Sequence, residues 1–327
     1  MSENENKYNS PLSATLKGIT DLFKKQDRIE GLKAEERIDG KKVLITGSSS
    51  GLGLATAKEL GRRGATVIMA VRSGIPEKGE EVKKASGSDQ VHMLPVDLSD
   101  FDTIENLVKA VKSQFGQIDI LICNAAVVSK NARKTKDGLE EMFTVNYLAK
   151  FALVNQLIKE AVFNIENTVP RIIFVSSESH RNPKEFDWDG FGLFEDYGIG
   201  KSVERYGYYK LLMTTFAMEL SRRLNKGAKI NYSVFSLCPG PVNSNIAREA
   251  PAFFQPLLSL VFKIFFRSPE TACEPVVYFA VSQEVEGKTN DYLFLMSRKE
   301  VDEKASNAEN GKILWEKTEA LLKKRAP

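Results

Sequence analysis

Tyr206 and Lys210 have the residue types and the spacing that proton transfer needs. Residues at i and i+4 share one face of a helix. A phenol titrates near about pH 10 on its own, and a neighbouring ammonium lowers that pKa because it favours the phenolate. The pair therefore predicts an acid–base group that works nearer neutral pH, although the same spacing also occurs in ordinary surface pairs.

Two more polar positions fit the same chemistry. The segment Arg171–Ser177 reads as a buried strand that ends in two serines. The second of these, Ser177, can donate a hydrogen bond to a substrate oxygen beside Tyr206, or can cap a turn. Asn146 lies among apolar residues of an expected helix, where its amide needs a partner. It fits either a satisfied buried amide or a residue that holds water in a proton relay.

The segment Val43–Gly53 combines a short apolar strand, a glycine-rich turn and the start of a helix. Gly47 allows a tight turn, while Gly51 and Gly53 let backbone approach a phosphate with no Cβ in the way. A helix N-terminus adds unpaired N–H groups and the positive end of the helix dipole. The segment therefore predicts a dinucleotide pyrophosphate site, with another phosphate ligand, or none, as the alternative.

Strand and helix patterns alternate from Val43 onward, and this alternation must position those residues. Ser99 and Asp102 are expected to cap the helix that follows the third strand. The pattern predicts an α/β fold with one doubly wound, Rossmann-type parallel sheet of about seven strands and helices on both faces. The expected strands are 43–46, 66–71, 91–96, 118–123, 171–176, 230–237 and 292–296, and the two longest helices are 139–157 and 206–224.

We expect three parts: a partly helical extension over 1–40, the Rossmann-type domain over 41–300 and a helical tail over 301–327. Apolar residues at helical spacing beside lysines in the extension fit a helix packed on the domain or one lying on a membrane surface. The apolar segment 245–267 is predicted to be a substrate lid, with a membrane-surface helix or plain core as alternatives. No stretch approaches the roughly 20 apolar residues of a membrane span.

Composition excludes several classes of function. The net charge is +3 with both signs intermixed, which gives no electrostatic case for binding nucleic acid. Three cysteines without CxxC spacing and two histidines argue against a disulfide framework and a metal site. Reduced thiols and a polar start without a secretory signal predict a cytoplasmic protein, with attachment to a membrane surface left open.

These motifs occur in the order found in the short-chain dehydrogenase/reductase family, which the chain resembles over roughly residues 40–297. The resemblance implies a catalytic tetrad. Tyr206 would be the acid–base, Ser177 would polarise the substrate carbonyl, and Lys210 would lower the pKa of Tyr206 and hold the nicotinamide ribose. Asn146 would anchor a relay water. Pairing through helices 139–157 and 206–224 as a homodimer is common in the family and stays open for this chain.

The same resemblance implies a row of cofactor contacts. One departure is that the family's usual Asn-Asn-Ala-Gly is Cys-Asn-Ala-Ala here, which crowds the backbone slightly near the cofactor. The expected cofactor-binding residues are Gly47, Ser49, Ser50, Gly51, Leu52, Gly53, Arg72, Asp97, Leu98, Asn124, Ala125, Ala126, Tyr206, Lys210, Pro239, Gly240, Val242 and Ser244.

Arg72 indicates which dinucleotide is bound. An acidic residue at the end of the second strand would bind the ribose 2′-hydroxyl of NAD, but this strand ends in Val71-Arg72. An arginine can pair with a 2′-phosphate through two hydrogen bonds, which predicts NADP(H) in preference to NAD(H). A solvated arginine at a strand end is the alternative.

The long gap between Ser177 and Tyr206, the aromatic segment Phe186–Asp189 and the helix around Trp315 resemble the retinol dehydrogenase subgroup. We therefore expect hydride transfer between NADP(H) and a carbonyl or alcohol of a lipophilic molecule such as a retinoid, steroid or long-chain aldehyde. One alternative is an enzyme like light-dependent protochlorophyllide reductase, which the segment Gly51–Ala57 also resembles. Another is a catalytically silent NADP(H)-binding scaffold at a membrane surface.

Overall fold

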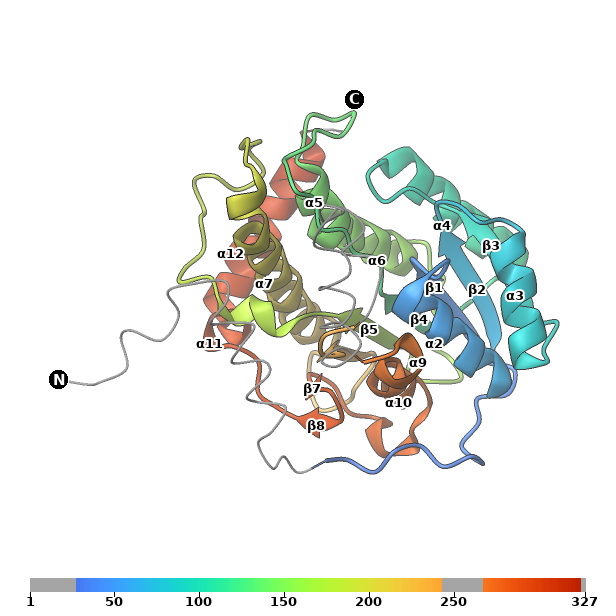
Figure 1. Ribbon diagram of the computed structural model, residues 1–327. Helices are drawn as coiled ribbons and strands as arrows, with labels where there is room; N and C mark the ends of the chain where they lie inside the picture. Colours follow the sequence, from blue (N-terminus) through green and yellow to red (C-terminus); the bar gives the residue numbers. More distant parts are fainter. Residues whose placement is uncertain (1–27, 243–266, 325–327) are drawn as a thin grey trace.

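The computed structural model describes residues 28–242 and 267–324, built around one twisted sheet (Figure 1). Neighbouring strands in the order β3-β2-β1-β4-β5-β6-β7-β8 are parallel, except that β8 runs antiparallel to β7. The order reverses between β1 and β4, as in doubly wound folds. The strands are β1 (Lys42–Thr46), β2 (Thr66–Val71), β3 (Val91–Pro95), β4 (Ile120–Cys123), β5 (Arg171–Val175), β6 (Ser233–Cys238), β7 (Tyr292–Phe294) and β8 (Ser297–Arg298).

This architecture confirms the predicted α/β doubly wound fold. The strand expected over 292–296 ends at Phe294, because Leu295 adopts a positive φ of 56° and turns the chain. The turn produces β8, an antiparallel edge strand that the sequence pattern did not predict.

Helices cover both faces of the sheet, because successive side chains of a strand point to opposite faces. Along β1, Leu44 belongs to one buried cluster, and Val43 and Ile45 belong to the other. The Leu44 face is covered by α4 (Phe101–Phe115), α6 (Ala149–Lys159), α7 (Ile199–Leu224) and α12 (Ala308–Lys323). The opposite face is covered by α2 (Gly51–Arg62), α3 (Glu77–Ser86), α9 (Pro269–Ala272) and α10 (Glu274–Val281).

Shorter helical elements fill the connections. A π-helical turn, η1, separates a short helix from α6, so the single helix expected over 139–157 is divided. These elements are α5 (Glu141–Phe143), η1 (Thr144–Leu148), η2 (Glu178–Arg181), η5 (Gln283–Val285) and α11 (Glu303–Ser306).

Two other helix starts differ from the expectation. The helix α7 begins at Ile199, earlier than the expected start at 206. The cap of α4 is Asp100, whose side chain accepts a hydrogen bond from the backbone of Asp102 at 2.9 Å. Ser99 does not cap the helix, since its own N–H and hydroxyl both donate to Asp97 Oδ1.

The C-terminal helix α12 packs on α7 within the first buried cluster. The ring of Trp315 lies 4.9 Å from that of Phe151 and 5.8 Å from that of Phe216. Thr318 hydrogen bonds through its hydroxyl to Tyr147 at 2.5 Å. The division of the chain into three parts stays a prediction.

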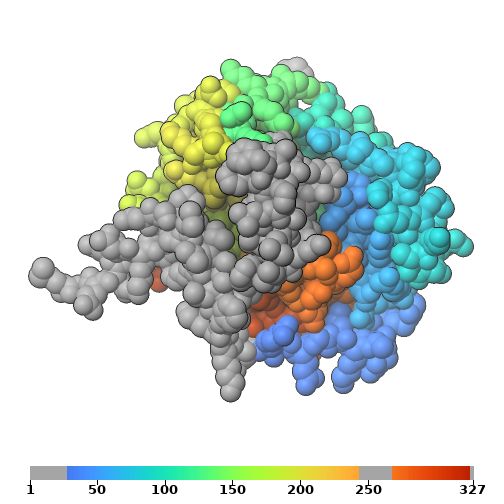
Figure 2. Space-filling view, viewed as in Figure 1, coloured from blue at the N-terminus to red at the C-terminus, as the bar shows by residue number. Residues whose placement is uncertain are grey.

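Figure 2 shows the molecule from the side drawn in Figure 1. Residues up to about 100 lie on the right in blue and cyan, and the segment near 200 lies on the upper left in yellow-green. Within residues 28–242 and 267–324, no helix is long and apolar enough to cross a membrane. The expected N-terminal amphipathic helix, the lid segment apart from Arg267, and Ser244 lie outside the described residues.

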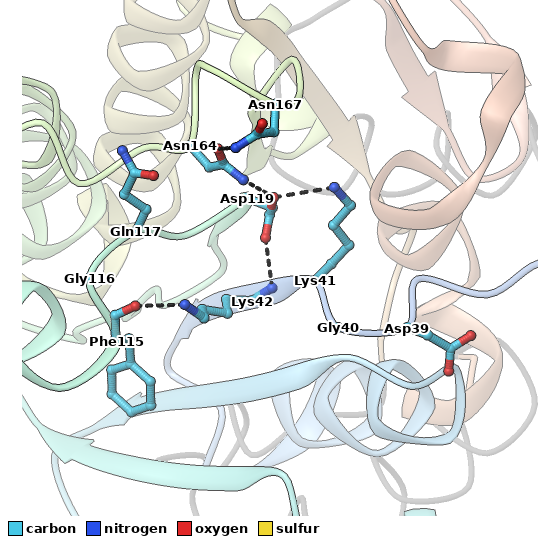
Figure 3. A pocket seen from close by; sticks show the side chains of 10 residues that line it. All are labelled: Asp39, Gly40, Lys41, Lys42, Phe115, Gly116, Gln117, Asp119, Asn164 and Asn167. Atoms are coloured by element: carbon cyan, nitrogen blue, oxygen red, sulfur yellow. Dashed lines mark hydrogen bonds and ion pairs between the residues drawn. The ribbon is translucent and has the colours of Figure 1, made fainter.

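Asp119 organises the edge of the sheet where β1, β4 and β5 begin. Its carboxylate accepts hydrogen bonds from Lys42 N at 2.9 Å, Asn164 Nδ2 at 3.0 Å and Thr168 Oγ1 at 3.4 Å, and pairs with Lys41 Nζ at 3.4 Å. These contacts surround a polar hollow of about 510 Å³ (Figure 3). The hollow therefore lies at the amino ends of the strands, away from the edge where doubly wound folds bind ligands.

Candidate active site

The predicted site residues lie directly after strands of the parallel sheet. The glycine turn follows β1, Arg72 follows β2, Asn124 follows β4, Ser177 follows β5 and Pro239 follows β6. Because the carboxyl ends of parallel strands meet at one edge, the fold brings these residues to the same edge of the sheet.

The turn after β1 leaves no room for side chains. Gly47 has a φ of 67°, and a Cβ there would lie 2.7 Å from the Cα of Ala125. A Cβ on Gly53 would lie 2.4 Å from the carbonyl oxygen of Gly47. The Asn124 side chain donates to the carbonyls of Thr46 and Gly47, both at 3.0 Å, and so ties the turn to β4.

The N-terminus of α2 is open to an anion. Its cap residue, Ser50, makes no side-chain hydrogen bond to the helix, and the first turn, which starts at Gly51, holds no acidic residue. The backbone N–H groups and the helix dipole are therefore not neutralised by the helix's own side chains. Together with the missing Cβ atoms, this arrangement fits a dinucleotide pyrophosphate.

Other expected cofactor residues surround this turn. Arg72 is exposed just beyond β2, while Asp97 is half-buried and Leu98 is buried after β3. Gly240 has a φ of 75°, and a Cβ there would lie 2.5 Å from Leu295 Cδ2. The remaining positions range from buried to exposed along the same edge, namely Ser49, Leu52, Ala126, Pro239 and Val242.

Tyr206 lies half-buried on α7, with its hydroxyl close enough to the side chain of Ser177 to interact with it. Burial raises the pKa of Tyr206, the nearby Cys238 raises it further, and the Ser177 side chain opposes both effects. The neighbouring Ser176 is buried and bonds to Thr214 Oγ1 at 2.7 Å instead. The structure thus brings Ser177, rather than Ser176, to the tyrosine.

Lys210 is buried beneath Tyr206, with its Nζ 5.5 Å from the centre of the tyrosine ring. Its ammonium donates to the carbonyl of Val175 at 2.8 Å. Burial lowers the pKa of Lys210 to about 8, and Cys238 partly offsets this. Burial is the largest cause of the pKa shift in both groups, and the role of Lys210 in lowering the pKa of Tyr206 stays a prediction.

Asn146 lies in the π-helical turn η1 and is completely buried. Its side-chain amide makes a reciprocal pair with the backbone of Val127, accepting from the N–H and donating to the carbonyl, both at 2.9 Å. The amide is therefore satisfied, and it fixes the chain that leaves β4. The backbone carbonyl oxygen of Asn146 accepts a hydrogen bond from another side chain, that of Lys150.

Lys150 is a buried lysine next to Asn146 that the sequence analysis missed. It is 1 % exposed, and its Nζ donates to the carbonyls of Asn146 at 2.8 Å and Val145 at 3.3 Å. Burial and then Lys210 hold its pKa well below the usual range, while Cys123 acts in the opposite direction. A lysine inside the otherwise apolar run Leu148–Val154 was the signal in the sequence.

Comparison with known proteins agrees with this geometry. The short chain dehydrogenase family model matches residues 41–186. Retinol dehydrogenase 14 of Mus musculus is 32% identical over 301 residues, which cover 86% of this chain and 86% of that protein. Retinol dehydrogenase 13 of Homo sapiens is 30% identical, with 98% of this chain and 97% of that protein covered.

Among solved structures, an uncharacterized protein from Mycobacterium paratuberculosis matches with a TM-score of 0.68 and 27% identity, covering 90% of this chain and 98% of that one. The chain belongs to the short-chain dehydrogenase/reductase family of nicotinamide-dependent oxidoreductases, as a member similar to the retinol dehydrogenases.

Proposed function

We propose that the protein is an NADP(H)-dependent oxidoreductase that interconverts a carbonyl and an alcohol on a lipophilic small molecule, with Tyr206 as the acid–base. The observation that carries this proposal is the contact between the Tyr206 hydroxyl and the Ser177 side chain at the edge of the sheet that also holds the open N-terminus of α2. A proton-transfer group and a phosphate-binding turn at one edge suit hydride transfer to or from a bound dinucleotide.

The residues would divide the work in carbonyl reduction as follows. Bound NADPH supplies the hydride. Ser177 donates a hydrogen bond to the carbonyl oxygen, and Tyr206 gives that oxygen its proton. The phenol of Tyr206 is protonated at neutral pH, so it has a proton to give. Lys210, held by Val175, lies where it can contact the ribose and restore charge balance after the proton leaves.

Arg72 supports the choice of NADP(H). The side chain is exposed at the end of β2, and the strand offers no carboxylate there that would repel a 2′-phosphate. Arg72→Asp should weaken NADPH binding by about tenfold or more relative to NADH, since a charged hydrogen bond contributes about 1.5–3 kcal/mol. Lys109→Asp on α4 is a charge-matched control. If Arg72→Asp leaves the ratio of NADPH to NADH affinity unchanged, as Lys109→Asp should, the assignment of Arg72 to the 2′-phosphate is contradicted.

The substrate class rests on relatives and on composition. The proteins that the chain resembles are named retinol dehydrogenases, which act on a lipophilic alcohol. The buried, free state of all three cysteines supports a reducing compartment such as the cytoplasm. Attachment to a membrane and pairing as a homodimer stay predictions, and flotation with liposomes and sedimentation would decide them.

A catalytically silent scaffold is the second candidate. It would bind NADPH through the glycine turn without turning over any substrate. The contact between Tyr206 and Ser177 argues against it, because a binding protein has no need to keep a paired phenol and hydroxyl.

Oxidation of NADPH and NADH should be followed spectroscopically with a panel of retinoid, steroid and aliphatic carbonyls. Turnover with NADPH that disappears in Tyr206→Phe and persists in Tyr208→Phe is the expected result. Tyr208 is the matched control because its hydroxyl bonds to the backbone of Asp187. Cofactor binding without turnover across the panel would favour the scaffold.

A further inference from the structure

The turn η2, which directly follows Ser177, is held by a segment far along the sequence. Glu178 pairs with Lys299 Nζ at 2.6 Å, and Arg181 donates to the carbonyl of Glu300. His180 accepts a hydrogen bond at Nε2 from the backbone N–H of Asp302 at 3.2 Å. Three side chains of the turn η2 therefore contact the segment Lys299–Asp302. This segment lies beyond the last strand of the sheet.

His180 has a single protonation pattern that satisfies its contacts. Its Nδ1 lies 2.7 Å from the carbonyl oxygen of Ser177, which can only accept. Its Nε2 faces the N–H of Asp302, which can only donate. The ring must therefore be neutral, with the proton on Nδ1. Burial, and then Arg181, lower the pKa of His180 to about 4, although the Ser177 backbone, Glu178 and Asp302 oppose this.

Ser179 completes the arrangement around the hydroxyl of Ser177. The Ser177 oxygen accepts from the Ser179 hydroxyl at 2.9 Å and from the Ser179 N–H at 3.2 Å. A hydroxyl oxygen has two acceptor positions and one proton. Since both acceptor positions are used, the Ser177 proton is left to donate, and the Tyr206 hydroxyl interacts with this side chain.

We propose that His180 is a positioning residue for Ser177, which it holds through the Ser177 carbonyl and anchors to the segment Lys299–Asp302. Two hydrogen bonds in series connect the N–H of Asp302 to the serine that lies against Tyr206. The catalytic consequence rests on the proposed function, whereas the hydrogen-bond arrangement does not. The C-terminal part of the chain thereby becomes a support of the site.

The protonation pattern can be tested without activity. The chain has only two histidines, so a nitrogen-15 spectrum of the rings holds two spin systems, and His92→Gln assigns the one that remains to His180. We expect a neutral ring with its proton on Nδ1 throughout the neutral range. A ring that carries its proton on Nε2, or that titrates near the ordinary pKa of about 6.5, would overturn the proposal.

Three variants then test the positioning role by turnover. His180→Asn retains an amide donor near the place of Nδ1, whereas His180→Leu retains neither contact and His180→Gln offers its amide farther out. We expect His180→Leu and His180→Gln to lose roughly tenfold or more in kcat with little change in KM for NADPH, and His180→Asn to recover part of the loss. The melting temperature of each variant is measured first, and kcat is compared below the lowest of them.

Equal kcat in the folded Asn, Gln and Leu variants would overturn the positioning role. If the Leu variant does not fold, the comparison of Asn with Gln decides the question. An absence of turnover in the unaltered protein would refute the proposed function instead, and the ring spectrum would still decide how His180 is bonded.

Discussion

The two edges of the sheet use polar side chains in opposite ways. At the amino edge, the carboxylate of Asp119 is paired on both oxygens, with Lys42 N, Asn164, Thr168 and Lys41 around it (Figure 3). At the carboxyl edge, the ammonium of Lys210 has three N–H groups, and within the described residues Val175 accounts for one of them.

This difference suggests that the polar groups at the amino edge act mainly on stability, whereas those at the carboxyl edge act mainly on catalysis. Paired groups at the amino edge stabilise the start of three strands, since a buried carboxylate with several donors is costly to leave unpaired. Groups at the carboxyl edge keep donors that a cofactor or substrate can use. Changes at one edge should therefore affect stability, and changes at the other should affect turnover.

Tyr206→Phe should give the largest effect. Removing the phenol hydroxyl deletes the proton donor, so kcat should fall by about 10²- to 10⁴-fold. The melting temperature should change little, because Tyr206 is half-buried and the ring stays in place. Steady-state kinetics and thermal unfolding of the same preparation check both parts. A large loss of stability in this variant would contradict the separation of the two edges.

Asp119→Asn should give the opposite result. The amide places N–H groups against donors such as Lys42 N and Lys41 Nζ, so the protein should lose roughly 2–3 kcal/mol of stability. The melting temperature should fall by several degrees, and kcat should be unchanged where the variant is folded. Asp39→Asn in the same hollow is the control, since that carboxylate is exposed. A loss of kcat at full folding would break the comparison.

Lys150→Met tests a buried group just behind the carboxyl edge. The pKa of Lys150 is depressed in the folded protein and about 10.4 when unfolded, so the unfolded chain binds the extra proton. The stability of the unaltered protein should therefore rise with pH until about pH 10.

Because methionine removes this proton, the variant should be more stable at pH 7 by about 1–2 kcal/mol, with the advantage shrinking towards pH 10. Denaturant unfolding at several pH values measures it, with the exposed Lys159→Met as the control. An advantage that does not depend on pH would show that Lys150 is not held neutral.

Lys41→Met should give the smallest effect. The ion pair of Lys41 with Asp119 is 3.4 Å long, and the lysine side chain is 37% exposed. Exposed pairs of this kind contribute about 0–1 kcal/mol, so the melting temperature should barely change. A loss as large as that of Asp119→Asn would mean that Lys41, rather than the backbone and amide donors, holds the carboxylate.

The parallel sheet and the glycine turn after β1 could be predicted from the sequence. The runs 43–45 and 67–71 are apolar throughout because both faces of the sheet are covered, and Gly47 and Gly53 stand where a Cβ would clash. Tyr206, Lys210 and Ser177 were predicted as a group, and the structure brings them to one edge. Their catalytic roles stay predictions.

Other features depend on contacts that a sequence pattern does not encode. The π-helical turn at Asn146 adds one residue to a helical turn and leaves the apolar spacing almost unchanged. Lys150 was missed because a buried lysine looks like a surface residue until the fold encloses it. The support of Ser177 by His180 joins two segments that meet only in the folded chain.

Transfer of deuterium from the labelled C4 position of NADPH to a carbonyl substrate tests the central claim most directly. With the label in the transferred position, the account predicts that the unaltered protein and folded Asp119→Asn form alcohol that carries one deuterium. Folded Tyr206→Phe should form almost no labelled alcohol in the same time. Equal amounts of labelled alcohol from all three proteins, or labelled alcohol lost in Asp119→Asn but kept in Tyr206→Phe, would contradict the assignment of chemistry to the carboxyl edge.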